Sequence, residues 1–230
     1  MAKILKLMDI NKVYGDKIKT QVLFDINLDF EESTFNSIIG ESGSGKSTLM
    51  NIMGTLDRAT SGDVEINGIN ILNMNKNELA VLRNEFIGFI FQFHYLLPEF
   101  TVMENILIPY RIKNKNITKE AISRAEELME IVGISKVKNN KATDISGGQQ
   151  QRTAIARALI NEPKIVLGDE PTGNLDSSTT EIVYDLLRDI NQRYKTTFII
   201  ITHDKRVAEK ADRIIEIKDG RIEMDISRKI

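Results

Sequence analysis

The chain has 230 residues, which is long enough for one large α/β domain with an inserted subdomain around a single core. Its 31 basic and 33 acidic residues leave a formal charge of −2, so no overall positive field would draw it onto nucleic acid or an anionic membrane surface. The absence of cysteine excludes disulfides, thiolate metal sites and cysteine nucleophiles, and two histidines are too few for a His-rich metal cluster.

The apolar segments are short. Residues 87–91 and 198–201 are among the longest, and they fall far below the roughly 18 residues that a membrane-spanning helix needs. The first residues include two lysines, but an acidic residue stands where the apolar part of a signal peptide would run. We therefore expect a cytoplasmic protein whose contact with a membrane depends on a protein partner.

Strand-like and helix-like segments alternate along the first part of the chain. Residues 35–39 form an apolar run that ends in a glycine-rich turn, and residues 47–56 continue with helical spacing. Asn67-Gly68 separates two further apolar runs, which predicts a hairpin. The pattern favours a mostly parallel sheet covered by helices, with an antiparallel part near the N-terminus.

Residues from about 92 to 145 interrupt this alternation and predict a helical insertion. Within them, Thr118 can cap a helix that Gly133 ends. The alternation then resumes with strands at 165–167 and 197–201. The helix between these strands has an apolar face with helical spacing, formed by Ile182, Leu186, Leu187 and Ile190. A second hairpin is predicted at Asp219-Gly220.

Residues 40–47, Gly-Glu-Ser-Gly-Ser-Gly-Lys-Ser, fit the P-loop pattern G-x-x-x-x-G-K-[ST] between a predicted strand and a predicted helix. Such a loop points backbone N–H groups at phosphates; Lys46 can reach the β- and γ-phosphates, and Ser47 can ligate Mg²⁺. A flexible glycine–serine loop is the alternative, which the Lys-Ser pair and the flanking elements disfavour. The predicted nucleotide-binding residues here are Gly40, Glu41, Ser42, Gly43, Ser44, Gly45, Lys46, Ser47 and Thr48.

The strand at 165–167 leads to a pair of acids. Asp169 suits Mg²⁺, and Glu170 would project toward the γ-phosphate, where a carboxylate can accept a proton from attacking water. Taken alone, two acids at a strand end are often a solvated turn, but the P-loop favours the catalytic interpretation. A GTPase is disfavoured, because residues 75–78, Asn-Lys-Asn-Glu, have the wrong acid for guanine recognition and no preceding strand.

Residues 145–152, Ile-Ser-Gly-Gly-Gln-Gln-Gln-Arg, resemble the signature motif of ABC ATPases, usually Leu-Ser-Gly-Gly-Gln. The motif opens a predicted helix and thus provides a second anion site. The resemblance covers essentially the whole chain. It implies one P-loop NTPase domain of ABC type over 1–230, with 1–91 and 146–230 as the catalytic α/β core and about 92–145 as an inserted helical subdomain. Ile145 in place of leucine, and Gly168 before Asp169, are small departures that remove no catalytic group.

The resemblance also implies roles for other side chains. Gln92 corresponds to the Q-loop glutamine, which touches Mg²⁺ or the lytic water, so the implied metal residues are Ser47, Gln92 and Asp169. Asp176 corresponds to the D-loop aspartate that communicates across a dimer. His203 corresponds to the switch histidine that holds the γ-phosphate and the attacking water. Tyr14 resembles the aromatic that stacks on adenine, although a core tyrosine on a strand fits the sequence equally well.

The family implies ATP and Mg²⁺ as ligands and a head-to-tail homodimer. In that dimer the motif formed by Ser146, Gly147, Gly148 and Gln149 caps the ATP of the other copy. It further implies a separate integral membrane permease, with the cassette peripheral on the inner face of the cell membrane and no nucleic acid partner. Residues 94–110 form an apolar and aromatic strip, part of which is expected to receive the coupling helix of the permease.

Residues 91–101 and 170–176 look like those of ATPases from lipoprotein-releasing and macrolide-export systems. Lipoprotein release, or macrolide or peptide export, is therefore the expected process. A soluble ABC-type ATPase of DNA repair or translation is the alternative. It is disfavoured because the insertion lacks sustained heptads and the chain holds one cassette. A nucleotide kinase would have no use for the signature motif or for His203.

Overall fold

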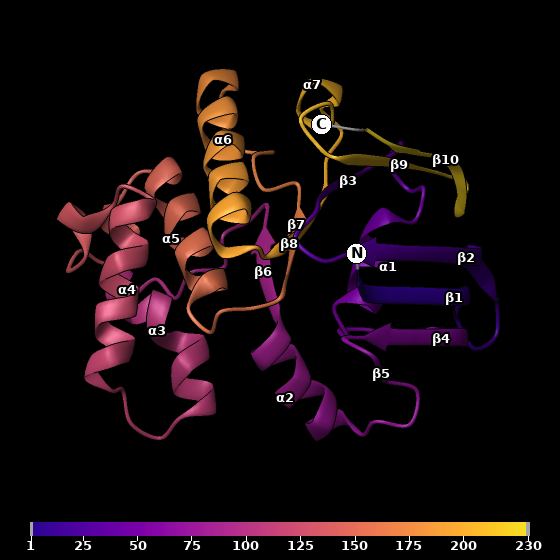
Figure 1. The fold of residues 1–230 in the computed structure, drawn as a ribbon, viewed down its shortest axis with the longest axis horizontal. Coiled ribbons are helices and arrows are strands. Elements are labelled where there is room, and N and C mark those ends of the chain that lie inside the picture. The colour runs from indigo at the N-terminus through magenta and orange to yellow at the C-terminus, as the bar shows by residue number, and fades with distance from the viewer. Residues whose placement is uncertain (1, 229–230) are drawn as a thin grey trace.

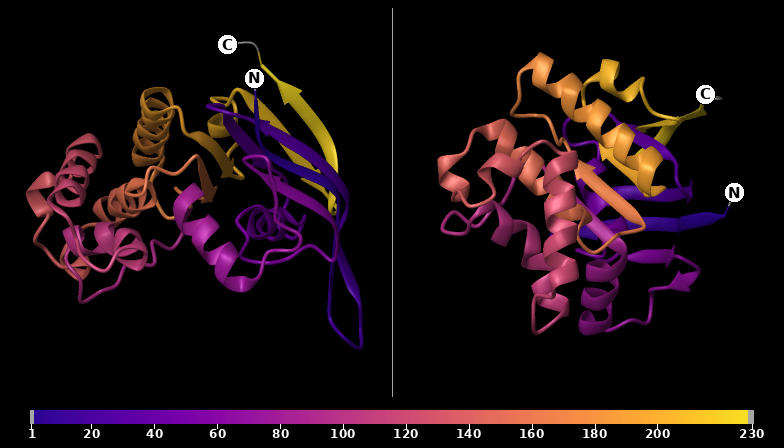
Figure 2. Two further views of the ribbon diagram at one scale, coloured as in Figure 1. Left: turned by 60° about the horizontal axis from the view of Figure 1, so that its bottom comes forward. Right: turned by 60° about the vertical axis from the view of Figure 1, so that its left-hand side comes forward.

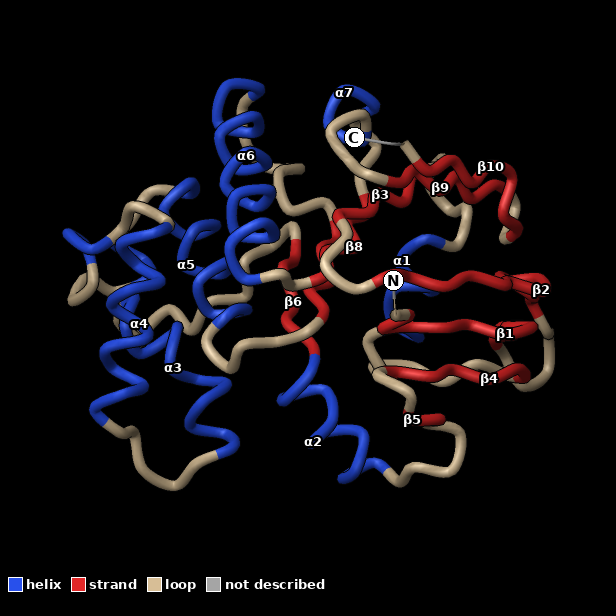
Figure 3. The backbone as a smooth tube through the Cα atoms, in the orientation of Figure 1, coloured by secondary structure: helices blue, strands red, loops and turns tan. Residues whose placement is uncertain are grey.

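A mixed six-stranded sheet runs through the centre of the molecule. The structure is a computed structural model that describes residues 2–228, apart from the side chains of residues 177, 178 and 205. The strand order is β10-β9-β3-β8-β7-β6, and β9, β3, β8, β7 and β6 are parallel. The strands are β3 (Phe35–Ile39), β6 (Ile87–Phe91), β7 (Ile165–Asp169), β8 (Thr197–Ile201), β9 (Arg213–Lys218) and β10 (Arg221–Ser227). All ten described strands are drawn in red in Figure 3.

The central strands form because their residues are apolar and often β-branched, which suits burial on both faces of a parallel sheet. Every residue of β3 and β8 is buried, and both strands match the predicted ranges. The third predicted strand, 165–167, extends to Asp169 in β7. Because the strands are parallel, their carboxyl ends meet at one edge of the sheet, where ligands bind in open α/β folds.

A four-stranded antiparallel sheet lies beside the central sheet, on the right in Figure 1. Its order is β2-β1-β4-β5, with β1 (Lys3–Tyr14), β2 (Thr20–Glu31), β4 (Ser61–Ile66) and β5 (Ile69–Asn70). Both predicted hairpins are confirmed. Asn67 and Gly68 join β4 to β5, and Asp219 and Gly220 join β9 to β10, all with positive φ as a type I′ turn requires. The β1–β2 hairpin extends beyond the neighbouring elements (Figure 2).

Three of the helices form a group of their own. Helices α3, α4 and α5 cluster on the side of the molecule away from the antiparallel sheet (Figure 1). Thr118 accepts a hydrogen bond from the Ala121 N–H and caps α4, and Gly133 follows its end with φ 71°, as predicted. The helices are α1 (Lys46–Met53), α2 (Lys76–Phe86), α3 (Val102–Lys113), α4 (Lys119–Ile131), α5 (Gly147–Leu159), α6 (Ser177–Tyr194) and α7 (Lys205–Ala208). No described helix is long and apolar enough to cross a bilayer.

The buried face of α6 matches the predicted one in part. Leu187 and Ile190 are fully buried and Leu186 packs against the same cluster, as expected, but Ile182 is 53% exposed. Val183 and Tyr184 take part in the core instead. Both sets of residues have helical spacing, so periodicity could not choose between them. The position of the helix over the sheet rotates the buried stripe by about one residue.

Alternate residues of the strands build cores on the two faces of the central sheet. Phe198 and Ile200 of β8 point into a cluster with the helices, whereas Ile199 and Ile201 point into a cluster with α1 and the antiparallel sheet. Close packing on both faces leaves the carboxyl edge of the sheet as a firm platform for polar side chains.

Candidate functional site

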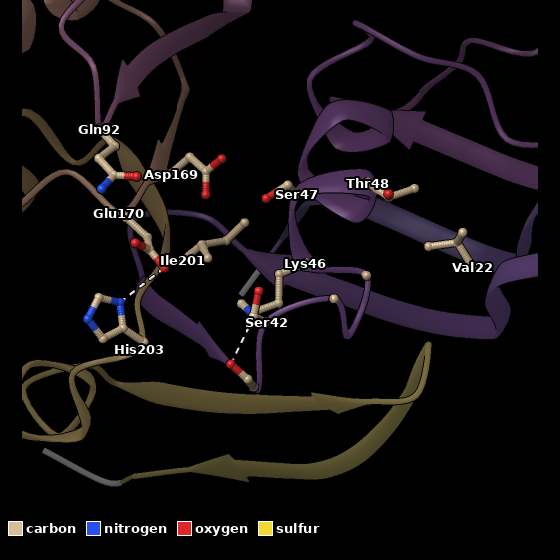
Figure 4. A pocket seen from close by; sticks show the side chains of 13 residues that line it. Val22, Ser42, Lys46, Ser47, Thr48, Gln92, Asp169, Glu170, Ile201 and His203 are labelled. Atoms are coloured by element: carbon tan, nitrogen blue, oxygen red, sulfur yellow. Dashed lines mark hydrogen bonds and ion pairs between the residues drawn. The ribbon is translucent and has the colours of Figure 1, made fainter. Parts of the chain in front are cut away.

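A polar pocket of about 520 Å³ lies at the carboxyl edge of the central sheet (Figure 4). It brings together segments that are far apart in the sequence: the P-loop, the end of β6, the end of β7 and the end of β8. Its lining consists of Val22, Gly40, Ser42, Gly43, Gly45, Lys46, Ser47, Thr48, Gln92, Asp169, Glu170, Ile201 and His203.

The P-loop connects β3 to α1 through glycines with unusual backbone angles. Gly40 has φ 150°, and a Cβ at this position would lie 2.1 Å from the carbonyl oxygen of Ile217. Gly45 has φ 103° and caps α1, so that the helix begins at Lys46 with its N-terminus at the pocket. Backbone N–H groups at a helix N-terminus favour phosphate. The loop therefore has the local geometry of an anion-binding site.

Lys46 is buried within the loop. Its Nζ donates to the carbonyl oxygens of Gly40 at 2.9 Å and Glu41 at 2.6 Å. Burial lowers the pKa of Lys46, and the negative charges of Glu170 and Asp169 oppose that shift. A phosphate in the pocket would give this desolvated cation a charged partner.

Ser47 and Asp169 line the same pocket. Burial raises the pKa of Asp169, while a hydrogen bond from the Ser47 hydroxyl and the charge of Lys46 oppose the shift. Gln92 lines the same pocket and adds an amide oxygen. The three side chains thus offer hydroxyl, carboxylate and amide oxygens, which are the hard donors that Mg²⁺ prefers. This donor set fits the predicted magnesium site.

Glu170 and His203 form a direct pair at the ends of β7 and β8. His203 Nδ1 lies 3.0 Å from Glu170 Oε1 (Figure 4). Glu170 has φ 44°, a strained angle for a non-glycine residue, and its N–H donates to the Ile201 carbonyl at 3.0 Å. This bond to the neighbouring strand holds the strained residue at the mouth of the pocket.

Gln92 is held by the segment that follows Glu170. Its Nε2 donates to Asn174 Oδ1 at 3.4 Å, and Asn174 Nδ2 donates to the Gln92 carbonyl at 3.1 Å. A Cβ at Gly173 would lie 2.7 Å from Gln92 Nε2, so only glycine allows this close approach. The end of β6 is thereby connected to the loop between β7 and α6.

The residues of the signature motif lie outside this pocket. Ser146 caps α5 by accepting a hydrogen bond from the Gln149 N–H at 3.3 Å, and its own N–H donates to Gln149 Oε1 at 2.9 Å. Among the described residues outside the backbone of its own helix, none would lie within 4 Å of a Cβ at Gly147, and a Cβ at Gly148 would lie 3.8 Å from Thr179, on α6. The motif therefore presents an open helix N-terminus that the pocket of its own chain does not use.

Asp176 caps α6 beside this motif. Its carboxylate accepts from the Thr179 N–H at 3.0 Å and from the Thr179 hydroxyl at 2.7 Å. The same Thr179 is the neighbour of Gly148, so the predicted D-loop aspartate lies near the signature motif.

The order of these parts along the chain, and their geometry, match a known protein family. Its model, described as "ABC transporter", matches residues 23–173. The chain belongs to the ABC transporter family. The resemblance and the predicted fold class are thus confirmed, and the cassette is an ATPase of the ABC type.

Relatives match the cassette over nearly its whole length. It is 46% identical over 224 residues to the lipoprotein-releasing system ATP-binding protein LolD 1 of Rhodopseudomonas palustris, covering 96% of this chain and 99% of the relative. It is 45% identical over 219 residues to LolD of Bacteroides fragilis, covering 95% and 100%. These relatives favour the transporter interpretation over a soluble ATPase of DNA repair or translation.

Solved structures of ATP-binding cassettes are also similar to this chain. A dimeric structure of the ATP-binding cassette MJ0796, described as a post-hydrolysis state bound to ADP and Pi, is 40% identical with a TM-score of 0.90, covering 98% of this chain and 100% of that one. The cassette CbiO1 of Clostridium perfringens, described as part of the transporter complex CbiONQ, is 27% identical with a TM-score of 0.88, covering 99% and 89%.

Tyr14 of the cassette lies at the end of β1 and is 40% exposed, so it is no core residue. Its hydroxyl donates to Asp57 Oδ2 at 2.7 Å, and Lys12 Nζ lies 4.6 Å from its ring centroid. The sequence did not predict that Lys12 and Asp57, which form an ion pair, both contact Tyr14. It also did not predict that Val22 lines the pocket. Val22 reaches the site because β2 lies against the P-loop, where a Cβ at Gly45 would be 3.2 Å from the Val22 carbonyl oxygen.

Sequence reasoning also missed Arg157, on α5. Its Nη1 donates to the Tyr95 carbonyl at 2.8 Å and its Nη2 to the His94 carbonyl at 2.6 Å. Burial lowers the pKa of Arg157. The guanidinium therefore fastens the segment after Gln92 to the helix of the signature motif, and no sequence pattern signals this.

Proposed function

We propose that this cassette is the ATP-hydrolysing subunit of a lipoprotein-releasing transporter and that it works as a head-to-tail pair. The supporting observation is the 44–46% identity to LolD proteins over 94–96% of the chain, combined with a complete set of hydrolytic side chains in one pocket.

The P-loop binds the phosphates of ATP. Backbone N–H groups of residues 40–47 and the N-terminus of α1 face the phosphates, and Lys46 exchanges its carbonyl partners for phosphate oxygens. Thr48 and Val22 line the same pocket, and Tyr14 lies close enough to Thr48 for their side chains to interact. Tyr14 therefore stacks on the adenine at this end of the site.

Ser47, Asp169 and Gln92 hold Mg²⁺. When bound, the ion neutralises the charge that develops on the phosphates. Asp169 serves best as a carboxylate, and the Ser47 hydrogen bond and the charge of Lys46 favour that form against burial.

Glu170 accepts the proton of the attacking water. Its carboxylate already contacts His203 at 3.0 Å, so the two side chains can share the water between them when His203 turns toward the γ-phosphate. The bond from the Glu170 N–H to Ile201 keeps the carboxylate at the mouth of the pocket during this change.

The second copy completes the site. Ser146, Gly147, Gly148 and Gln149 form an open helix N-terminus that no element of its own chain's pocket covers. It caps the γ-phosphate held by the partner's P-loop, and Asp176, which caps the N-terminus of α6, communicates between the two sites.

The membrane partner docks on an apolar groove between α2, β6, α3 and α5. The groove has a volume of about 390 Å³, and Leu56, Phe89, Ile108 and Ile112 contribute apolar surface to it. Arg157 lies in the same groove and holds the backbone that follows Gln92. Residues 92–145 thus move as a subdomain that transmits closure to a permease, with the cassette on the inner face of the membrane.

The test uses a tagged Glu170→Gln chain, purified with Mg·ATP from gently solubilised membranes of the organism that encodes it. We expect ATP binding without hydrolysis and a stoichiometric membrane protein with few spanning helices and a large external domain. The Asp185→Asn chain, changed at an exposed carboxylate, is the matched control and should hydrolyse ATP normally. Recovery of ribosomal or DNA-repair proteins with no membrane protein would refute the transport role.

A further inference from the structure

Tyr184, on the sheet-facing side of α6, carries a buried hydroxyl that the proposed mechanism does not use. The side chain is 1% exposed and packs in the core under the helices. Among the residues that the structure describes, none lies in regular hydrogen-bond geometry with this hydroxyl. Burying a hydroxyl without a partner opposes folding, and phenylalanine would fill the same space without that cost. Packing alone therefore does not explain why this position carries a hydroxyl group.

Two other buried hydroxyls lie next to it. Burial raises the pKa of Tyr184, and weak hydrogen bonds with the hydroxyls of Thr202 and Thr172 oppose that rise. The phenol consequently stays protonated and can donate. Thr202 Oγ1 accepts from the Asp204 N–H at 3.1 Å, which leaves one lone pair for a second donor.

Each threonine belongs to a loop that carries a reacting side chain. Thr172 lies two residues after Glu170, and Thr202 directly precedes His203. Both threonines are buried, at 9% and 3% exposure, and neither lines the pocket, whereas Glu170 and His203 face it (Figure 4). The hydroxyl of Tyr184 thus stands behind the pair that acts on water, within reach of both loops.

We propose that Tyr184 is a positioning residue of the ATPase site. When the site closes on ATP, its hydroxyl donates to Thr202 and accepts from Thr172, and this bridge fixes the spacing between the loops of Glu170 and His203. The poorly paired hydroxyl favours closure, because closure brings these two hydrogen bonds into regular geometry. This inference rests on the roles proposed above for Glu170 and His203.

The experiment is Tyr184→Phe, which removes one oxygen atom. We expect kcat for ATP hydrolysis to fall about tenfold, as misplacement of reacting groups does, with KM for ATP within about twofold of the original value. The Tm without nucleotide should stay the same or rise, because the lost hydroxyl had no partner in regular hydrogen-bond geometry. In a Glu170→Gln background, adding Mg·ATP should raise Tm less when Tyr184→Phe is also present than when Tyr184 is kept.

Tyr194→Phe, at the other end of the same helix, is the matched control. The Tyr194 hydroxyl donates to Glu127 at 2.9 Å and accepts from Arg124 at 3.2 Å, far from the pocket lining. This variant should lower Tm and leave kcat unchanged, the opposite of Tyr184→Phe. If Tyr184→Phe does not fold, Thr172→Val should show the same loss of kcat.

An unchanged kcat in Tyr184→Phe, or in Thr172→Val where the first variant does not fold, would overturn the inference. So would a fall in kcat that accompanies a fall in Tm without nucleotide. Glu170→Gln separates this result from failure of the proposed function: an active Glu170→Gln chain refutes the assigned base, whereas an inactive one beside an active Tyr184→Phe chain refutes only the bridge.

Discussion

At the scale of single residues, the pocket concentrates groups that are unfavourable on their own. Lys46 and Asp169 are desolvated, and their pKa values move in the directions that weaken their charges. Glu170 holds a strained φ angle. Such arrangements are common where a protein is built to receive a charged ligand. Phosphate bound near Lys46 and a metal ion bound near Asp169 would each provide an opposite charge, which would offset the free-energy cost of desolvating these two groups.

Asp169→Asn should raise the Mg²⁺ concentration for half-maximal ATP hydrolysis by about 10- to 100-fold, the usual effect of losing a residue that orients a metal shell. Ser47 would lose its carboxylate partner. Titrating Mg²⁺ at fixed ATP measures the shift. An unchanged titration would show that Asp169 does not take part in metal binding.

At the scale of elements, an ion pair connects α6 to the amino-terminal ends of β3 and β9. Arg188, on α6, donates to both carboxylate oxygens of Asp212, at 2.9 and 2.5 Å. Asp212 also accepts from the Phe35 N–H at the start of β3. Burial would raise the pKa of Asp212, but the hydrogen bonds from Arg188 and Phe35 outweigh it, so the folded-state pKa lies below its usual value. One carboxylate thus joins a helix to the strand that leads into the P-loop.

Asp212→Asn should lower the free energy of unfolding by roughly 2 kcal/mol at pH 7, a discounted value for a pair whose side chains remain about one quarter exposed. Because the pKa of Asp212 is lower in the folded state than in the unfolded state, the ionised carboxylate stabilises the fold at pH values above the unfolded-state pKa of about 4. This stabilisation is lost as the pH falls through the folded-state pKa. The deficit of the variant should therefore shrink below about pH 4. Urea unfolding at the two pH values measures it, and a deficit that is independent of pH would contradict this account.

At the scale of the whole molecule, the P-loop and the signature motif of the cassette, the two surfaces proposed to bind phosphate, do not meet. The P-loop belongs to the pocket at the sheet edge, whereas the signature motif opens α5 outside that pocket. Two copies arranged head to tail would join each P-loop to the other signature motif, and a two-fold axis creates both contacts together. This arrangement predicts that neither motif acts within its own chain.

Lys46→Ala and Ser146→Arg should each abolish hydrolysis alone, but a mixture of the two should recover activity. Half of the pairs in an equal mixture are mixed, and each mixed pair holds one intact composite site, so the rate should approach about a quarter of the original. An ATPase assay on the mixture measures the recovery. If the signature motif instead acted on the P-loop of its own chain, the mixture would show no recovery of activity.

The sequence by itself determined the parts of this protein that depend on local chemistry. Positive-φ turns at Asn67-Gly68 and Asp219-Gly220, the cap at Thr118 and the glycine pattern of the P-loop act over a few residues, and each lies where it was predicted. The fold class followed from the alternation of such elements. Their chemistry is set by neighbours along the chain, so no tertiary contact was needed to recognise them.

Only the tertiary structure decided the contacts between distant segments. The Glu170–His203 pair, the hold of Arg157 on the backbone after Gln92, and the position of Tyr184 behind the site depend on how helices settle on the sheet. Periodicity left the rotation of α6 open by about one residue, which is why Tyr184 escaped prediction. Packing against β7 and β8 fixes that rotation, because the close-packed core between α6 and the sheet has room for one face of the helix, the face that carries Tyr184.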